Sequence, residues 1–212
     1  MNAFVLAGGQ STRMGRDKAL LEIGGRPLVV HMLELVRSLG LNARVCGSRP
    51  DMAQFAEVIP DNFPRCGPLA GIEAALAISD SELNLFVPID TPGLPGEFLR
   101  WMTGRAGTSQ AAATIPSCGG RPQPLCAVYS RRLQPGLRRS LAAADYKVMT
   151  ALRAAAAALG EAIDNFHVEC VAPVLQPGAW PPGSCLPWFR NLNTPTDIEQ
   201  LAQRLERRAI IQ

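Results

Sequence analysis

The chain has 212 residues, of which 47% are hydrophobic and 18% are charged, and its formal net charge is +3. These values fit one globular domain over residues 1–212, and the small charge does not indicate a nucleic-acid-binding protein. Because there is no apolar run of ~18 residues and no signal-peptide pattern at the N-terminus, we expect a cytoplasmic protein that does not bind membranes.

The first half of the chain alternates short apolar stretches with helical patterns. Strands are expected at residues 3–6, 43–47, 57–61 and 83–90, and helices at residues 26–40, 67–77 and 95–104. The strands are uniformly apolar and do not alternate with polar residues. This pattern predicts an α/β protein whose parallel sheet is buried on both faces.

The second half continues with strands and helices and then changes composition. Further strands are expected at residues 111–116 and 124–130, and helices at residues 131–144 and 146–160. Residues 172–187 are rich in proline and glycine, which indicates an irregular surface loop. A last helix is expected after Thr196, where Ile198, Leu201 and Leu205 repeat at helical spacing.

The chain contains six cysteines and two histidines. No CxxC pair occurs, and a chain of this length without a secretory pattern is expected to keep its thiols reduced. The ligand spacing of a structural zinc site is also missing.

The segment Gly8–Lys18 directly follows the first strand and is the first candidate site. Glycine-rich turns in this position bind phosphate, because glycine lets backbone N–H groups approach the anion closely. The segment matches neither the GxGxxG dinucleotide pattern nor a Walker loop. Arg13 and Lys18 would bring two cations to one group of phosphates, which stabilises charge during phosphoryl transfer. The alternative is an ordinary surface loop with basic residues.

Two aspartates end apolar strands and would join this loop beyond the carboxyl ends of the strands, where open α/β sheets bind ligands. Asp90, in FVPIDTP, is a candidate ligand of Mg²⁺, which prefers one or two carboxylates together with phosphate oxygens and water. Asp61, in VIPDNFP, has a similar placement. The alternative for each is a carboxylate that caps a local turn, formed at Asp90 by Thr91 and Pro92.

Several blocks of the chain, in the same order, resemble the molybdenum cofactor guanylyltransferases, which attach GMP to molybdopterin. The blocks are LAGGQSTRMGRDKALLEIGGRPL, GPLAGI, PIDTPGLP, GRPQPLCAVYS and NLNTPTDIEQL. The resemblance extends from Phe4 to about Leu201. The first block is shared in looser form by many nucleotidyltransferases, and its combination with the DTP and NxNTP blocks is more specific. The resemblance implies a doubly wound, mostly parallel, Rossmann-like nucleotidyltransferase fold, which is a three-layer α/β sandwich.

The resemblance also implies roles for the matching residues. Arg13, Lys18 and Asp90 match the catalytic positions, with Asp90 as the ligand of a Mg²⁺ cofactor. The nucleotide-binding positions are Leu6, Ala7, Gly8, Gly9, Lys18, Asp61 and Asp90, and the positions near the pterin acceptor are Asn191 and Asn193.

The sequence departs from the family pattern in two places. Cys46 stands where the family often has an asparagine that contacts the nucleotide, and a thiol is a weak hydrogen-bonding group. The loop at residues 172–187 is longer than is usual in the family and carries Trp180, with Trp188 just after it. An indole could stack on a pterin ring; the alternative is a loop whose aromatic residues fold over the core.

The implied reaction is attack of the terminal phosphate of molybdopterin on the α-phosphorus of GTP, with release of pyrophosphate. The nucleophile is already ionised near neutral pH, so positioning and charge stabilisation are sufficient without a general base. GTP and molybdopterin are then the substrates, and transient contacts with molybdenum cofactor accessory proteins or apoenzymes are expected.

Other functions use the same fold. Cytidylyl transfer to molybdopterin, or nucleotidyl transfer to a sugar phosphate, has the same chemistry, although LAGG at residues 6–9 favours guanine because cytidylyl relatives tend to read LAAG. A non-catalytic nucleotide-binding regulator is disfavoured by the joint presence of Arg13, Lys18 and Asp90. An NAD-dependent oxidoreductase is disfavoured by the missing GxGxxG pattern and ribose-binding acid.

Overall fold

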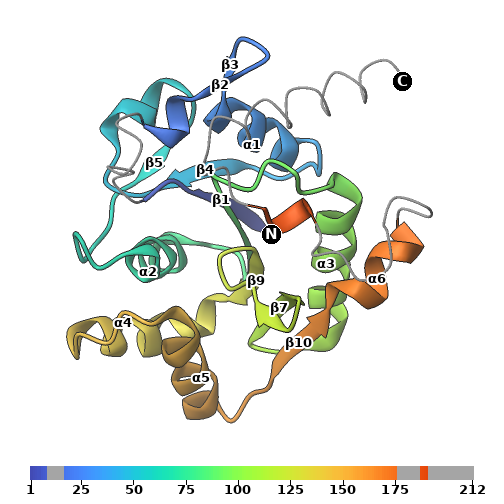
Figure 1. Cartoon of the computed structure of the whole chain (residues 1–212). Helices are drawn as coiled ribbons and strands as arrows, with labels where there is room; N and C mark the ends of the chain where they lie inside the picture. Colours follow the sequence, from blue (N-terminus) through green and yellow to red (C-terminus); the bar gives the residue numbers. More distant parts are fainter. Residues whose placement is uncertain (9–16, 176–186, 191–212) are drawn as a thin grey trace.

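The computed structural model describes residues 1–8, 17–175 and 187–190, and a mixed sheet forms its central layer (Figure 1). The strand order is β10-β7-β9-β6-β1-β4-β5, with β8 paired to β7. The strands are β1 (Asn2–Leu6), β4 (Ala43–Cys46), β5 (Val58–Ile59), β6 (Leu83–Pro88), β7 (Ala113–Cys118), β8 (Arg121–Pro122), β9 (Ala127–Ser130) and β10 (Ile163–His167). A separate hairpin is formed by β2 (Glu22–Ile23) and β3 (Arg26–Pro27).

Helices cover both faces of the sheet, with α1, α3 and α6 on one face and α2, α4 and α5 on the other (Figure 1). The described α-helices are α1 (Leu28–Arg37), α2 (Pro68–Ile78), α3 (Gly96–Ser109), α4 (Gln134–Ala142), α5 (Val148–Leu159) and α6 (Val168–Leu175). The described 3₁₀ helices are η2 (Lys18–Leu20), η3 (Pro50–Gln54), η4 (Arg131–Leu133) and η5 (Pro187–Phe189). No helix in the described part of the chain is long and apolar enough to cross a membrane.

The central strands are apolar throughout because each face of the sheet packs against a helical layer. In β1, Ala3 and Val5 belong to the core under α1, α3 and α6, whereas Phe4 and Leu6 belong to the core under α2, α4 and α5. Strands β1, β4, β5 and β6 are parallel, and β9 is antiparallel to both β6 and β7. The predicted doubly wound, mostly parallel α/β sandwich is therefore confirmed.

The order of the strands creates a switch point at β1. The chain passes from β1 to β4 and β5 on one side and then returns to β6 on the other side of β1. Parallel strands place their carboxyl ends at one edge. The connection that leaves β1 leads to α1 on one face of the sheet, whereas the connection that leaves β5 leads to α2 on the other face. In open α/β sheets this kind of crevice is where ligands bind.

Some expectations about the second half were wrong. β10 was missed because it is an edge strand that pairs only with β7 in the described sheet, so Asp164, Asn165 and His167 are compatible with its position. The loop expected from residue 172 was wrong for residues 172–175, which belong to α6. Val168 and Ala172 lie one helical turn apart and are buried against the core, which outweighs the presence of Pro173.

Cys46, Cys66, Cys126 and Cys170 form no disulfide bond in this structure. Cys185 and the helix expected after Thr196 lie outside the described residues, as does most of the proline- and glycine-rich stretch.

Candidate active site

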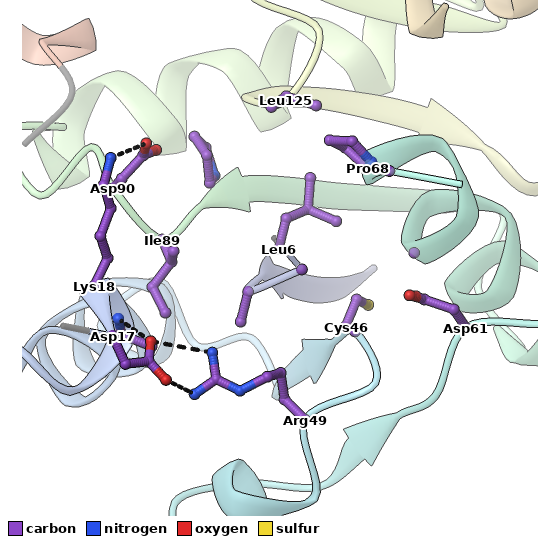
Figure 2. Close-up of a pocket in the computed structure, with 17 residues that line it drawn as sticks. Leu6, Asp17, Lys18, Cys46, Arg49, Asp61, Pro68, Ile89, Asp90 and Leu125 are labelled. Carbon is purple, nitrogen blue, oxygen red and sulfur yellow. Dashed lines mark hydrogen bonds and ion pairs between the residues drawn. The ribbon is translucent and has the colours of Figure 1, made fainter. Parts of the chain in front are cut away.

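A pocket with a cavity volume of about 240 Å³ opens at the carboxyl edge of β1, β4, β5 and β6 (Figure 2). Its walls come from the residues that follow each of these strands and from the start of α2. Of the residues singled out in the sequence, Leu6, Ala7, Gly8, Lys18, Asp61 and Asp90 line this pocket, as does Cys46. Gly9, Arg13, Asn191 and Asn193 lie outside the described residues.

Two glycines let the chain segments after β1 and β4 pass very close to each other. Gly47 has a φ of +131°, and a Cβ atom at this position would lie 3.0 Å from the backbone nitrogen of Gly8. The N–H of Ala7 donates to the carbonyl of Cys46 at 3.0 Å, so the two segments are also hydrogen-bonded. The close approach shapes one wall of the pocket and needs glycine at residue 47.

One side of the pocket carries a partly buried ion pair. The Nζ atom of Lys18 lies 3.8 Å from Oδ2 of Asp90, and the two side chains are 18% and 24% exposed. Burial raises the pKa of Asp90, and the ammonium of Lys18 opposes this rise. The local turn is closed by the hydroxyl of Thr91, which donates to the carbonyl of Pro88 at 3.3 Å. The carboxylate of Asp90 therefore faces a cation, and a different side chain closes the turn.

The other side of the pocket holds Asp61 beside Cys46 (Figure 2). Oδ1 of Asp61 is buried and has no hydrogen-bond partner among the described residues. Burial raises the pKa of Asp61, and a backbone hydrogen bond from Ser48 opposes this rise. Burial also raises the pKa of the Cys46 thiol well above its usual value, and the nearby charge of Asp61 adds to the rise. An unpartnered buried acceptor is costly, so this carboxylate is well suited to accept N–H groups from a ligand.

Gly71 of α2 makes room between these residues. A Cβ atom at Gly71 would lie 3.4 Å from Cβ of Cys46 and 3.5 Å from both Oδ1 of Asp61 and Cδ2 of Leu6. The helix therefore approaches the carboxyl edge of the sheet closely, and the space that remains belongs to the pocket.

Arg49 also lines the pocket, and sequence reasoning missed it. Its guanidinium pairs with Asp17 and with Asp51, and Figure 2 shows the contact with Asp17. The position follows the second parallel strand, β4, so it lies at the edge where ligands were expected. Cys46 lies at the same edge, three residues before Arg49.

The side chains in the pocket fit a Mg²⁺ ion that is bound partly by substrate and water, and they do not fit a metal held by protein ligands alone. Within the described residues there is no group of three or more His, Cys, Asp or Glu side chains that could hold a metal. Asp90 is a single, partly exposed carboxylate, and Mg²⁺ is commonly held by one or two carboxylates with phosphate oxygens and water. A cation would also offset the cost of burying this carboxylate, which is the cause of its raised pKa.

Trp188 does not lie in the pocket. It is 2% exposed, belongs to the core under α1, α3 and α6, and packs against Phe98 with a centroid distance of 5.1 Å. In this position its indole folds over the core and is not available to stack on a ligand. Trp180 lies outside the described residues.

Comparisons with known proteins give a consistent result. Residues 3–186 match the sequence model of the MobA-like NTP transferase domain. Over 209 residues, covering 95% of both chains, the sequence is 32% identical to the molybdenum cofactor guanylyltransferase of Photobacterium profundum.

Solved structures with low sequence identity share the fold. Molybdopterin-guanine dinucleotide biosynthesis protein A from Archaeoglobus fulgidus matches with a TM-score of 0.77 and 23% identity, covering 98% of this chain and 100% of that one. The 2-C-methyl-D-erythritol 4-phosphate cytidylyltransferase from Thermus thermophilus matches with a TM-score of 0.59 and 15% identity, covering 96% and 98%. The fold therefore extends to transferases with different bases and acceptors.

Proposed function

Because the chain belongs to the MobA-like NTP transferase family, we propose that it transfers GMP from GTP to the terminal phosphate of molybdopterin. The resemblance expected from the sequence blocks is confirmed, and the chain is a nucleotidyltransferase. The observation that best supports the proposed reaction is the pocket itself, which brings Lys18 and Asp90 together beside Gly8. In the reaction, a phosphate oxygen of the acceptor bonds to the α-phosphorus of GTP, and the bond to the leaving pyrophosphate breaks.

The phosphate side of the pocket would be formed by Gly8, Lys18 and Asp90. The backbone at Gly8 allows close approach of a phosphate, and Lys18 would offset the negative charge that develops on the leaving pyrophosphate. Arg13 would act with Lys18 in this role. Asp90 would hold Mg²⁺, which when bound would supply positive charge that offsets the negative charge of the phosphates.

The base side would be formed by Asp61 and Cys46, with Leu6 and Ala7 beside them. Guanine presents adjacent N–H donors on one edge, and the carboxylate of Asp61, which lines the pocket, has an oxygen without a hydrogen-bond partner among the described residues. The acceptor substrate would bind near Asn191 and Asn193, as the family resemblance implies. A cytoplasmic location and transient contacts with accessory proteins or apoenzymes are part of the same proposal.

A second candidate is cytidylyl transfer with the same chemistry. Cys46 supports this second candidate, because a buried thiol forms only weak hydrogen bonds and so does little to distinguish guanine from cytosine. The two candidates differ in the nucleotide and not in the fold.

The test is pyrophosphate release from GTP, CTP or ATP in the presence of molybdopterin, with and without Mg²⁺. We expect release with GTP that depends on both the acceptor and Mg²⁺, and a loss of about 10²-fold or more in Asp90→Asn. Asp80→Asn is the matched control. Asp80 is exposed, does not line the pocket, and accepts a hydrogen bond from the side chain of Asn2. A preference for CTP would show that the protein transfers CMP and not GMP. If pyrophosphate release does not depend on the acceptor with any nucleotide, the proposal is rejected.

A further inference from the structure

We propose that Arg49 is a positioning residue that sets the place of Lys18 in the pocket by holding Asp17. The proposal rests on the proposed function, because it assigns Lys18 to the nucleotide phosphates. Arg49 lies outside the sequence blocks that resemble the family, and the sequence analysis predicts no role for it.

The guanidinium of Arg49 holds Asp17 through two parallel contacts. Nη1 of Arg49 donates to Oδ1 of Asp17 at 3.2 Å, and Nη2 donates to Oδ2. Asp17 and Arg49 are 32 residues apart in sequence, and the Arg49 side chain is 18% exposed. A two-point contact of a planar fork with a carboxylate fixes orientation as well as distance.

Asp17 in turn fixes the turn that contains Lys18. Its Oδ1 accepts a hydrogen bond from the N–H of Ala19 at 3.0 Å, and its carbonyl accepts from the N–H of Leu20 at 3.2 Å. Lys18 therefore lies between two residues joined by a side-chain cap, and Ala19 is buried in the core. Movement of the Asp17 carboxylate would shift the backbone of Lys18 and so its distance from Asp90.

Arg49 is itself held by the segment that touches Gly8. The N–H of Gly47 donates to the carbonyl of Ile59 at 3.0 Å, and the N–H of Arg49 donates to the carbonyl of Gly47 at 2.8 Å. Gly47 also packs against the backbone of Gly8. The short segment from Gly47 to Arg49 thus contacts the chain on both sides of residues 9–16, at Gly8 and at Asp17.

The charges around Arg49 argue for positioning and against direct phosphate binding. Besides Asp17, Arg49 donates from Nε to Oδ1 of Asp51 at 2.9 Å and from Nη2 to Oδ2 of Asp51 at 2.6 Å. One cation is therefore shared by two carboxylates, which leaves a net negative group. Such a group does not attract a triphosphate, whereas it can hold the turn that carries Lys18.

The experiment compares Arg49→Gln, Asp17→Asn and the double variant that carries both of these changes. Asp51→Asn is the matched control. Asp51 is exposed and contacts Arg49 without lining the pocket. Pyrophosphate release at saturating GTP gives kcat, its GTP dependence gives KM, and thermal shift by GTP gives binding separately. Arg49→Lys tests the need for two-point contact, since an ammonium has no planar fork.

We expect Arg49→Gln and Asp17→Asn each to lower kcat by at least about tenfold, because a displacement of about 1 Å near reacting groups is costly. The double variant should be no worse than either single variant, and Asp51→Asn should stay within about twofold of the unsubstituted protein. Arg49→Lys should recover only part of the loss. The melting temperature without nucleotide should stay close to that of Asp51→Asn in all variants.

Additive losses, unchanged kcat, or losses that follow the melting temperature would overturn the positioning role. These outcomes are distinguishable from failure of the proposed function. If the proposed function fails, the unsubstituted protein itself will show neither a thermal shift with GTP nor acceptor-dependent release of pyrophosphate.

Discussion

The ammonium of Lys18 lies 3.8 Å from Oδ2 of Asp90, which joins the turn at η2 to the segment after β6. Both side chains are mostly buried, so each lowers the cost of keeping the other charged away from bulk water. The pair places a cation and a carboxylate together at the edge of the sheet where the strand order switches.

Replacing Lys18 by Gln should lower kcat by about 10²-fold, because the proposed function assigns this cation to the negative charge that develops on the leaving pyrophosphate. Lys18→Arg keeps the charge and should lose less. The only other lysine of the chain, Lys147, is exposed, so Lys147→Gln serves as the control. Steady-state kinetics with GTP as the varied substrate is the measurement. Equal kcat values for the Lys18 and Lys147 variants would contradict the catalytic assignment.

Replacing Asp61 by Asn should stabilise the protein at neutral pH in the absence of ligand. Burial raises the pKa of Asp61, so the folded state favours the protonated form and ionisation costs stability once the pH exceeds the raised pKa. The gain should shrink as the pH falls through the raised pKa, and it should vanish below the ordinary pKa of about 3.9. Because the side chain is only half-buried, a rise in Tm of roughly 2 °C is expected at pH 7.

The control for this pH dependence is Asp80→Asn. A hydrogen bond from Asn2 lowers the pKa of Asp80, which is the opposite direction. Asp80→Asn should therefore gain no stability at neutral pH. Thermal melts of both variants between pH 3 and pH 7 distinguish the cases, and a gain of Asp61→Asn that persists at pH 3 would show that its cause is not ionisation.

Replacing Gly71 by Ala should weaken nucleotide binding while keeping the fold. The new methyl group would lie 3.4 Å from Cβ of Cys46 and 3.5 Å from Oδ1 of Asp61, which are ordinary van der Waals distances, and it would take up space beside the pocket. In a helix interior, Ala is favoured over Gly by about 1 kcal/mol, so Tm should not fall. Gly104→Ala in α3 is the matched control because its Cβ would meet nothing within 4 Å. Thermal shift by GTP should drop for Gly71→Ala only; the same GTP affinity in both variants would argue against a ligand beside α2.

Replacing Cys46 by Asn should increase the preference for GTP over CTP. An amide offers both a donor and an acceptor where the buried thiol is a weak partner, and Asp61 lies beside it. Cys46→Ser is the control, since it changes polarity with little change in volume. The ratio of kcat/KM for the two nucleotides is the measurement, and an unchanged ratio for Cys46→Asn would place base recognition elsewhere in the pocket.

Several features followed from the sequence because they depend on local pattern. The uniformly apolar stretches at β1 and β6 predicted a sheet buried on both faces, and the residues after them, Gly8 and Asp90, predicted where a pocket would form. β10 and residues 172–175 were missed. An edge strand tolerates polar residues, and a helix turn containing proline forms when its apolar face has a core to cover.

By itself the sequence determined the α/β fold and the edge of the sheet that carries the pocket, because the burial of each element leaves a repeating pattern in its own residues. Only the tertiary structure decided which side chains meet there. Arg49 with Asp17 and Lys18 with Asp90 are contacts between segments distant in the chain, and Gly71 of α2 likewise comes close to Cys46 at the end of β4. They depend on how the strands align and how closely the helices approach the sheet, and local residue patterns do not encode these distances.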